Sequence, residues 1–229
     1  MGEMVEFPSN GTSGTGYLAT PPSGGAGIGL IVIQEWWGLV DHIKDVCDRF
    51  AGEGFTALAP DLYHGESTTE PDEAGKLMMA LNLEKAAKDM SGAVDFLVKH
   101  DKVRGDGIGV TGFCMGGGLA QMLAVQRADS IRACVPFYGV IAWPNAQPDW
   151  SKLEAPVQMH IAERDGFFTP DAARQLEQQL KDLGKEVELF VYEGADHAFF
   201  NDTRPDVHDE TAASTAWTRT LEFLRAKLG

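Results

Sequence analysis

Residues 27–33, Gly-Ile-Gly-Leu-Ile-Val-Ile, form a run without a single polar side chain. A strand with one face in water alternates apolar and polar residues, whereas a strand in a parallel sheet is covered on both faces and is apolar throughout. The run therefore predicts a buried parallel strand. Because such a strand needs helices on both sides of its sheet, the run favours an α/β fold.

The rest of the chain alternates strand and helix patterns. Residues 41–53, for example, start at Asp41, a capping residue type, and repeat apolar side chains at a helical spacing. We predict further strands at 55–60, 107–111, 131–138, 157–162 and 187–192, and further helices at 82–100, 117–127, 170–183 and 211–228. This order predicts a mostly parallel central sheet flanked by helices on both faces. Functional loops are then expected at the carboxyl ends of the strands, with residues 63–75 as a surface loop over one rim of the site.

Length and charge narrow the class of protein. A chain of 229 residues fits one domain over 1–229. The net charge of −15 would repel nucleic acid and anionic membranes, so neither is expected as a partner. The first residues are acidic rather than basic, and the apolar run at 28–33 is too short to span a bilayer, so we expect a soluble cytoplasmic protein.

The three cysteines are widely separated and form no Cys-x-x-Cys pair, which argues against a disulfide framework or a structural zinc site. Cys47 falls on the apolar face of its predicted helix and is expected in the core. Cys114 lies between a predicted strand and a predicted helix, in the segment 112–116, Gly-Phe-Cys-Met-Gly. This is the context of a nucleophile elbow, where the flanking glycines permit a sharp turn and the helix N-terminus stabilises negative charge.

One other interpretation of this segment stays open, and a second can be excluded. Cys114 could be a buried structural cysteine beside a glycine-rich turn. A phosphate-binding loop is not indicated, since no Lys-Ser/Thr pair follows the glycines and no dinucleotide-binding fingerprint is present.

A nucleophile of this kind needs a histidine to move protons and an acid to orient it, in the chain order nucleophile, acid, histidine. His197 is the preferred histidine, because it follows the last predicted strand on a loop that starts with a glycine. The other histidines are less suited: His42 and His100 in predicted surface helices, His160 inside a strand, His208 in an acidic loop, and His64 as a residue that could lie on the rim.

Asp165 is the preferred acid, since it lies in the turn that follows the predicted strand 157–162. Glu163 in the same turn is the alternative. Asp171 is better explained as an acid in the first turn of a helix, where it favours the helix dipole.

Four segments now carry a resemblance: 34–38 (Gln-Glu-Trp-Trp-Gly), 59–63 (Ala-Pro-Asp-Leu-Tyr), 112–117 and 194–199 (Gly-Ala-Asp-His-Ala-Phe). With them the chain resembles, over essentially its whole length, the dienelactone hydrolase family, the carboxymethylenebutenolidases of the α/β-hydrolase fold. The resemblance implies a catalytic triad of Cys114, Asp165 and His197. It also implies that Glu35 holds the resting thiol until substrate displaces it, and that Glu35 then takes the thiol proton.

The resemblance extends to the binding of substrate. Backbone N–H groups of Trp36 and Met115 would form the oxyanion hole. We predict contacts to substrate from four further side chains: Trp37, Tyr138, Phe199 and Lys76. The two tryptophans could instead be simple packing residues, although adjacent tryptophans at a strand end could also wall an apolar pocket.

The chain departs from the family at the arginines that grip the carboxylate of dienelactone. One lies in the segment that corresponds to the helix around Lys76, and the other lies four residues after the catalytic histidine. Here no arginine occurs between Arg49 and Arg104, and position 201 is Asn. Arg204 or Lys76 could substitute, but a neutral or more apolar ester is as well supported as dienelactone.

The leading hypothesis is a hydrolase that cleaves small-molecule lactones or carboxylic esters through a thioester on Cys114, with no metal or organic cofactor, as a monomer or small homo-oligomer. A different class is a ligand-binding or sensor protein of the same fold with low turnover. A redox protein is a third class, although no resolving cysteine lies near Cys114 in the sequence.

Overall fold

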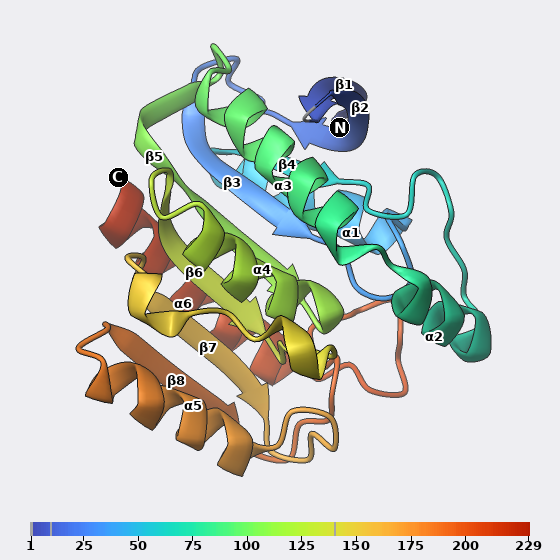
Figure 1. The fold of residues 1–229 in the computed structure, drawn as a ribbon, viewed down its shortest axis with the longest axis vertical. Helices are drawn as coiled ribbons and strands as arrows, with labels where there is room; N and C mark the ends of the chain where they lie inside the picture. Colours follow the sequence, from blue (N-terminus) through green and yellow to red (C-terminus); the bar gives the residue numbers. More distant parts are fainter. Residues whose placement is uncertain (1, 10, 140) are drawn as a thin grey trace.

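The computed structural model describes residues 2–9, 11–139 and 141–229. Its centre is a sheet with the strand order β1-β2-β4-β3-β5-β6-β7-β8 (Figure 1). The strands are β1 (Glu3–Ser9), β2 (Thr12–Ala19), β3 (Gly27–Ile33), β4 (Phe55–Pro60), β5 (Val103–Phe113), β6 (Ile131–Phe137), β7 (Val157–Ala162) and β8 (Val187–Tyr192). Strands β3 to β8 pair in parallel, which confirms the predicted sheet.

Helices cover both faces of this sheet. One face carries α1 (Asp41–Gly52) and α6 (Glu210–Leu228), and the other carries α3 (Leu83–Val98), α4 (Met115–Gln126) and α5 (Pro170–Asp182). Helix α2 (Pro71–Ala80) lies beyond the carboxyl ends of the strands (Figure 1). Two 3₁₀ turns, Pro144–Ala146 and Trp150–Lys152, lie between β6 and β7.

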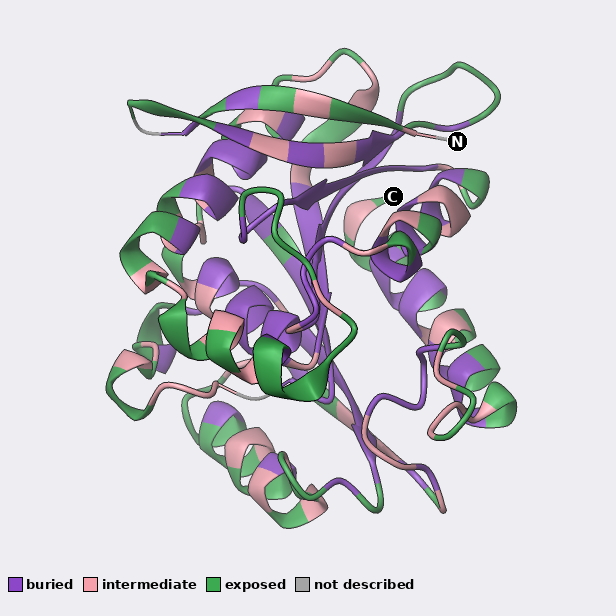
Figure 2. Ribbon diagram, turned by 90° about the vertical axis from the view of Figure 1, so that its right-hand side faces the viewer, coloured by how far each residue is buried: buried purple, intermediate pink, exposed green. Residues whose placement is uncertain are grey.

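Strand β3 shows why its sequence is apolar throughout. Leu30 and Val32 belong to the core cluster under α1 and α6, whereas Ile31 and Ile33 belong to the cluster under α3 and α4. All four side chains are fully buried. The sheet is thus a buried layer between two apolar layers, and the helices turn their exposed faces outward (Figure 2).

The N-terminal hairpin was not predicted. Strands β1 and β2 pair antiparallel, and β2 also pairs antiparallel with β4 at the edge of the sheet. Strand β2 is rich in Gly, Ser and Thr, and both strands are partly exposed, but Phe7 and Leu18 are buried on the inner face. A half-buried edge strand needs only a few apolar residues, so its signal in the sequence is weak.

Three local predictions were wrong. We predicted a loop over 63–75, but the loop ends before Pro71, because α2 starts at this residue. A proline is well tolerated at the first position of a helix. Asp41 does not cap α1: the capping position is Val40, and the Asp41 carboxylate pairs with Lys44 at 3.2 Å. His42 is only 3% exposed and does not lie on the surface of its helix.

Candidate active site

Cys114 lies at the turn between β5 and α4, directly after the strand's last residue. Its φ of 55° and ψ of −119° form a conformation that residues with a side chain rarely adopt. The turn is possible because the backbone comes very close at both flanking glycines: a Cβ on Gly112 would collide with the Gly116 carbonyl, and one on Gly116 with the Gln34 carbonyl. The strained turn presents the Cys114 side chain at the carboxyl edge of the sheet.

His197 and Asp165 meet at the same edge. The Nδ1 atom of His197 lies 2.7 Å from Oδ2 of Asp165, whose side chain is fully buried. The other carboxylate oxygen of Asp165 accepts hydrogen bonds from the backbone N–H groups of Phe167 at 2.8 Å and Phe168 at 2.9 Å. The carboxylate is thus held at both oxygens, so His197 must donate through Nδ1 and direct Nε2 elsewhere.

Burial disfavours the imidazolium form of His197, but the hydrogen bond to Asp165 and the influence of the nearby Cys114 side chain outweigh this effect and raise the pKa of His197 to about 10. A histidine that is protonated beside a cysteine stabilises the thiolate form of the sulfur. The structure thus brings together the three residues Asp165, His197 and Cys114, with a hydrogen bond between the first two. The alternative acid, Glu163, instead accepts a hydrogen bond from the backbone N–H of Gly194 at 2.8 Å.

The two backbone N–H groups predicted to form the oxyanion hole belong to residues that follow neighbouring strands of the sheet. In the sheet Ile33 of β3 is paired with Gly112 of β5, and Trp36 and Met115 each follow three residues later. Met115 is the first residue of α4, where backbone N–H groups have no partner within the helix. The ring of Trp36 packs edge-on against Trp37, at 4.9 Å between centroids. The two loops thus start side by side next to Cys114.

Glu35 is buried in this region. It is 1% exposed, and its Oε2 accepts a hydrogen bond from Nδ2 of Asn201 at 2.8 Å. Burial raises the pKa of Glu35, although His42 and the Asn201 amide act in the opposite direction. Sequence reasoning missed Asn201 as a partner, because the two residues are 166 positions apart.

The side chains predicted to contact substrate differ in how deeply they are buried. Tyr138 is fully buried with a φ of 37°, its ring lies 4.9 Å from that of His197, and its hydroxyl has no hydrogen-bond partner among the described residues. Phe199 is also fully buried and packs on Tyr138 and Tyr192. The Lys76 side chain is 71% exposed and pairs with Glu73.

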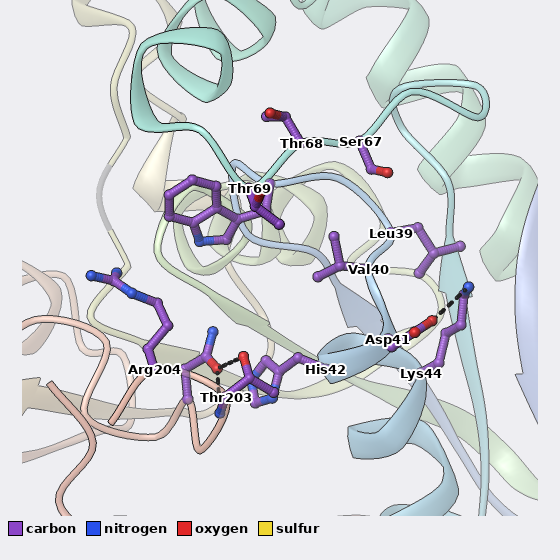
Figure 3. A pocket seen from close by; sticks show the side chains of 12 residues that line it. Leu39, Val40, Asp41, His42, Lys44, Ser67, Thr68, Thr69, Thr203 and Arg204 are labelled. Atoms are coloured by element: carbon purple, nitrogen blue, oxygen red, sulfur yellow. Dashed lines mark hydrogen bonds and ion pairs between the residues drawn. The ribbon is translucent and has the colours of Figure 1, made fainter. Parts of the chain in front are cut away.

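A pocket of about 530 Å³ is lined by Asn201, the hydrogen-bond partner of Glu35. Thr203 and Arg204 line it as well (Figure 3). Trp37 lines this pocket, with the Arg204 guanidinium over its ring at 5.7 Å. His42 lines it as well, and its Nδ1 lies 3.3 Å from a carboxylate oxygen of Asp202. The helical spacing does place His42 on the same face as the buried Val46, so its burial had a signal in the sequence.

Comparison with known proteins identifies the family of the chain. The model of the family described as "Dienelactone hydrolase family" matches residues 15–228. The chain belongs to the dienelactone hydrolase family. It is 41% identical to "Protein usf" of Aquifex pyrophilus and 36% identical to a protein of Aquifex aeolicus named "Putative carboxymethylenebutenolidase", with complete coverage of all chains.

A crystal structure titled "Putative Dienelactone Hydrolase", from Klebsiella pneumoniae, superimposes with a TM-score of 0.88 and 28% identity, over 98% of both chains. This dienelactone hydrolase family member therefore has the α/β-hydrolase fold that the sequence predicted. Within the residues that the structure describes, no group of three or more His, Cys, Asp or Glu side chains is arranged to hold a metal ion. None of the described helices has the length and apolar character needed to cross a membrane.

Proposed function

We propose that this member of the dienelactone hydrolase family cleaves lactone or carboxylic ester bonds through a thioester on Cys114. The observation that carries the proposal is the hydrogen bond of 2.7 Å between Asp165 and His197, together with a Cys114 side chain near enough to raise the pKa of the imidazole. This is the geometry that a nucleophile, a proton carrier and an orienting acid need. The name of the Aquifex aeolicus relative points to lactones as one substrate class.

Acylation begins from the Cys114–His197 pair. The sulfur attacks the carbonyl carbon of the ester, and the π electrons of the carbonyl move onto its oxygen. The backbone N–H groups of Met115 and Trp36 receive this oxyanion. When the tetrahedral intermediate collapses, the C–O bond breaks and His197 gives its proton to the leaving alkoxide. The products are a thioester and an alcohol, which in a lactone stay on one molecule.

Deacylation uses the same residues in the opposite direction. Nε2 of His197 takes a proton from water, and the hydroxide oxygen attacks the thioester carbon. The C–S bond then breaks and releases a carboxylic acid, and the thiolate returns to its place beside the imidazolium. The Asp165 carboxylate stabilises the imidazolium throughout, because it is held in place by two backbone donors.

We propose that the substrate does not need a carboxylate group. Position 201 carries an amide, and that amide is already bonded to Glu35. Arg204 is paired with Asp206 at 3.0 Å, and Lys76 with Glu73 at 2.6 Å. A substrate carboxylate would therefore have to displace an existing ion pair.

The chemistry also suits a reducing compartment such as the cytoplasm, because a nucleophilic cysteine is inactivated by oxidation. Cys114 and the two buried cysteines, Cys47 and Cys134, are all free.

Steady-state hydrolysis of a p-nitrophenyl ester and of a lactone tests the proposal, with Cys114→Ala as the decisive variant. We expect turnover by the wild-type protein and none above background by Cys114→Ala. Equal turnover by the variant would overturn the nucleophile. A stoichiometric burst of nitrophenol without turnover would instead support the ligand-binding or sensor protein.

A further inference from the structure

We propose that a second pocket, formed between α4, α5 and the connection from β6 to β7, binds a small neutral molecule that carries a carboxamide next to an aromatic or apolar group. The pocket has a volume of about 270 Å³. In Figure 1 the connection from β6 to β7 runs between α4 and α5. Of the described residues that line this pocket, none is Cys114, Asp165 or His197. The inference thus goes beyond the proposed function and does not depend on it.

The lining of this pocket is uncharged. The part of the lining that the structure describes contains no Asp, Glu, Lys, Arg or His, although the chain has 34 acidic and 19 basic residues. A charged ligand would lose its hydration there and find no counter-ion, so the pocket favours a neutral ligand. Amides and aromatic rings dominate the lining instead, through Gln121, Gln147, Gln175, Gln179, Trp150 and Phe168.

Gln121 lies at the bottom of the pocket and is 2% exposed. Its Nε2 donates to the carbonyl oxygens of Gly117 at 3.3 Å and Gly139 at 3.4 Å. A carbonyl oxygen can only accept, so the NH₂ group must face the two glycines. The Oε1 atom then has no hydrogen-bond partner among the described residues. Because a buried acceptor without a partner is unfavourable, the pocket offers this oxygen to a ligand that donates.

The backbone around Gln121 prevents its amide from turning to another partner. Gly117 and Gly139 are in close contact, and a Cβ on Gly139 would lie 2.6 Å from the carbonyl carbon of Gly117. The Gln121 amide bridges these two fixed segments. A rotation that gave Oε1 a new partner would break both of the hydrogen bonds from Nε2, so the acceptor stays directed away from the glycines.

The upper part of the pocket matches the rest of a carboxamide ligand. Gln175 and Gln179 are exposed and lie one turn apart on α5, so their side chains are neighbours. Their amides carry both donors and acceptors and can bind the C=O group of the ligand. Trp150, which is 7% exposed, and the half-buried Phe168 offer aromatic surface to an apolar group. Since so little of Gln121 is exposed, only a slim planar group such as a carboxamide reaches it.

An NMR titration of the ¹⁵N-labelled protein with benzamide tests the site. The side-chain NH₂ signals of Gln121 and Gln175 are the reporters, because both residues line the pocket. We expect saturable shifts of both signals with benzamide. N,N-dimethylbenzamide has no N–H group and benzoate is charged, so each should bind about 5- to 10-fold more weakly. Equal binding of N,N-dimethylbenzamide would refute the role of the acceptor. No saturable shift with benzamide up to its solubility limit would show that the pocket holds only water, and would overturn the proposal.

Gln121→Met removes the acceptor and keeps a side chain of similar length. We expect it to weaken benzamide binding by about 5- to 10-fold, followed through the Gln175 signal. Gln178→Met is the matched control, because Gln178 lies on α5, bonds to Asp182 at 2.7 Å and is not in the lining. Unchanged affinity in Gln121→Met, or an equal loss in both variants, would contradict the site. If Gln121→Met does not fold, as its thermal unfolding would show, the three ligands on the wild-type protein still decide.

Cys114→Ala separates this proposal from the proposed function. Because Cys114 is not among the residues of the lining, the affinity for benzamide should stay within about twofold of the wild-type value in Cys114→Ala. Benzamide that inhibits ester hydrolysis competitively and leaves the Gln121 signal unshifted would belong to the active site and would overturn the second pocket. Ester turnover that persists in Cys114→Ala would defeat the proposed function alone, whatever the titration shows.

Discussion

The substitution Asp165→Asn tests the orientation of His197, the histidine that we propose to be catalytic. In the wild-type protein one oxygen of Asp165 is held by the N–H groups of Phe167 and Phe168, and the other faces Nδ1 of His197. The asparagine must place its oxygen against the two N–H donors, which leaves its NH₂ group facing His197. Nδ1 then has to accept, so the proton of a neutral imidazole moves to Nε2.

The size of the expected effect has two parts. The lost hydrogen bond to a charged group is worth about 1.5–3 kcal/mol, which alone corresponds to a decrease in kcat of about 10- to 150-fold. The wrong tautomer adds to this decrease, because Nε2 can no longer accept a proton from water. We therefore expect kcat to fall by roughly 10³-fold or more.

The assay is steady-state hydrolysis of a p-nitrophenyl ester, with ¹⁵N NMR of the histidine side chains to identify the tautomer of His197. The substitution is nearly isosteric, so the thermal midpoint should change little. A kcat within tenfold of the wild-type value, in a folded variant with the proton on Nε2, would refute the reasoning.

Three further predictions concern groups around the site. The pKa of His197 in the folded protein is raised from 6.5 to about 10, so its contribution to stability is fully present below about pH 6.5 and is lost as the pH rises to about 10. The difference in unfolding free energy between the wild-type protein and His197→Gln should therefore shrink over this range. A difference that stays constant with pH would contradict the raised pKa. Tyr138→Phe removes a buried hydroxyl without a hydrogen-bond partner among the described residues, so it should raise the free energy of unfolding in denaturant by about 1 kcal/mol. A fall in the free energy of unfolding by more than about 1 kcal/mol would show that the hydroxyl is hydrogen-bonded in solution. Lys76→Ala removes a side chain that is 71% exposed and paired with Glu73, so the ratio of kcat/KM for carboxylated esters to that for neutral esters should change by less than about twofold. A fall in that ratio by about tenfold would identify Lys76 as a ligand of the substrate carboxylate.

The sequence could predict those features that are determined by local pattern. The apolar run of β3 indicated burial on both faces, and each of its side chains does lie in one of two core clusters. The elbow around Cys114 was predictable because glycine is needed where two backbones approach closely, and both flanking positions are glycines. Asp165 and His197 were predictable because both follow strands at one edge of a parallel sheet.

Other features depend on tertiary neighbours, which no local pattern contains. The hydrogen bond between Glu35 and Asn201 joins residues from opposite parts of the chain, and an asparagine in a loop has no signal for such a partner. Phe199 was expected against substrate because it lies near a predicted loop end, but it is fully buried beside the turn at Ala198. The β1–β2 hairpin escaped prediction because an edge ribbon can be half-exposed and still pair.

The central claim is that Cys114 carries the acyl group as a thioester. Rapid mixing of the protein with a p-nitrophenyl ester, acid quenching and mass spectrometry of the digest measure this directly. We predict that the peptide containing Cys114 gains the mass of the acyl group within the first turnover, that this adduct is lost on treatment with hydroxylamine, and that it is absent in Cys114→Ala. Turnover of the ester without any adduct on Cys114, or with an adduct on another residue, would contradict the account.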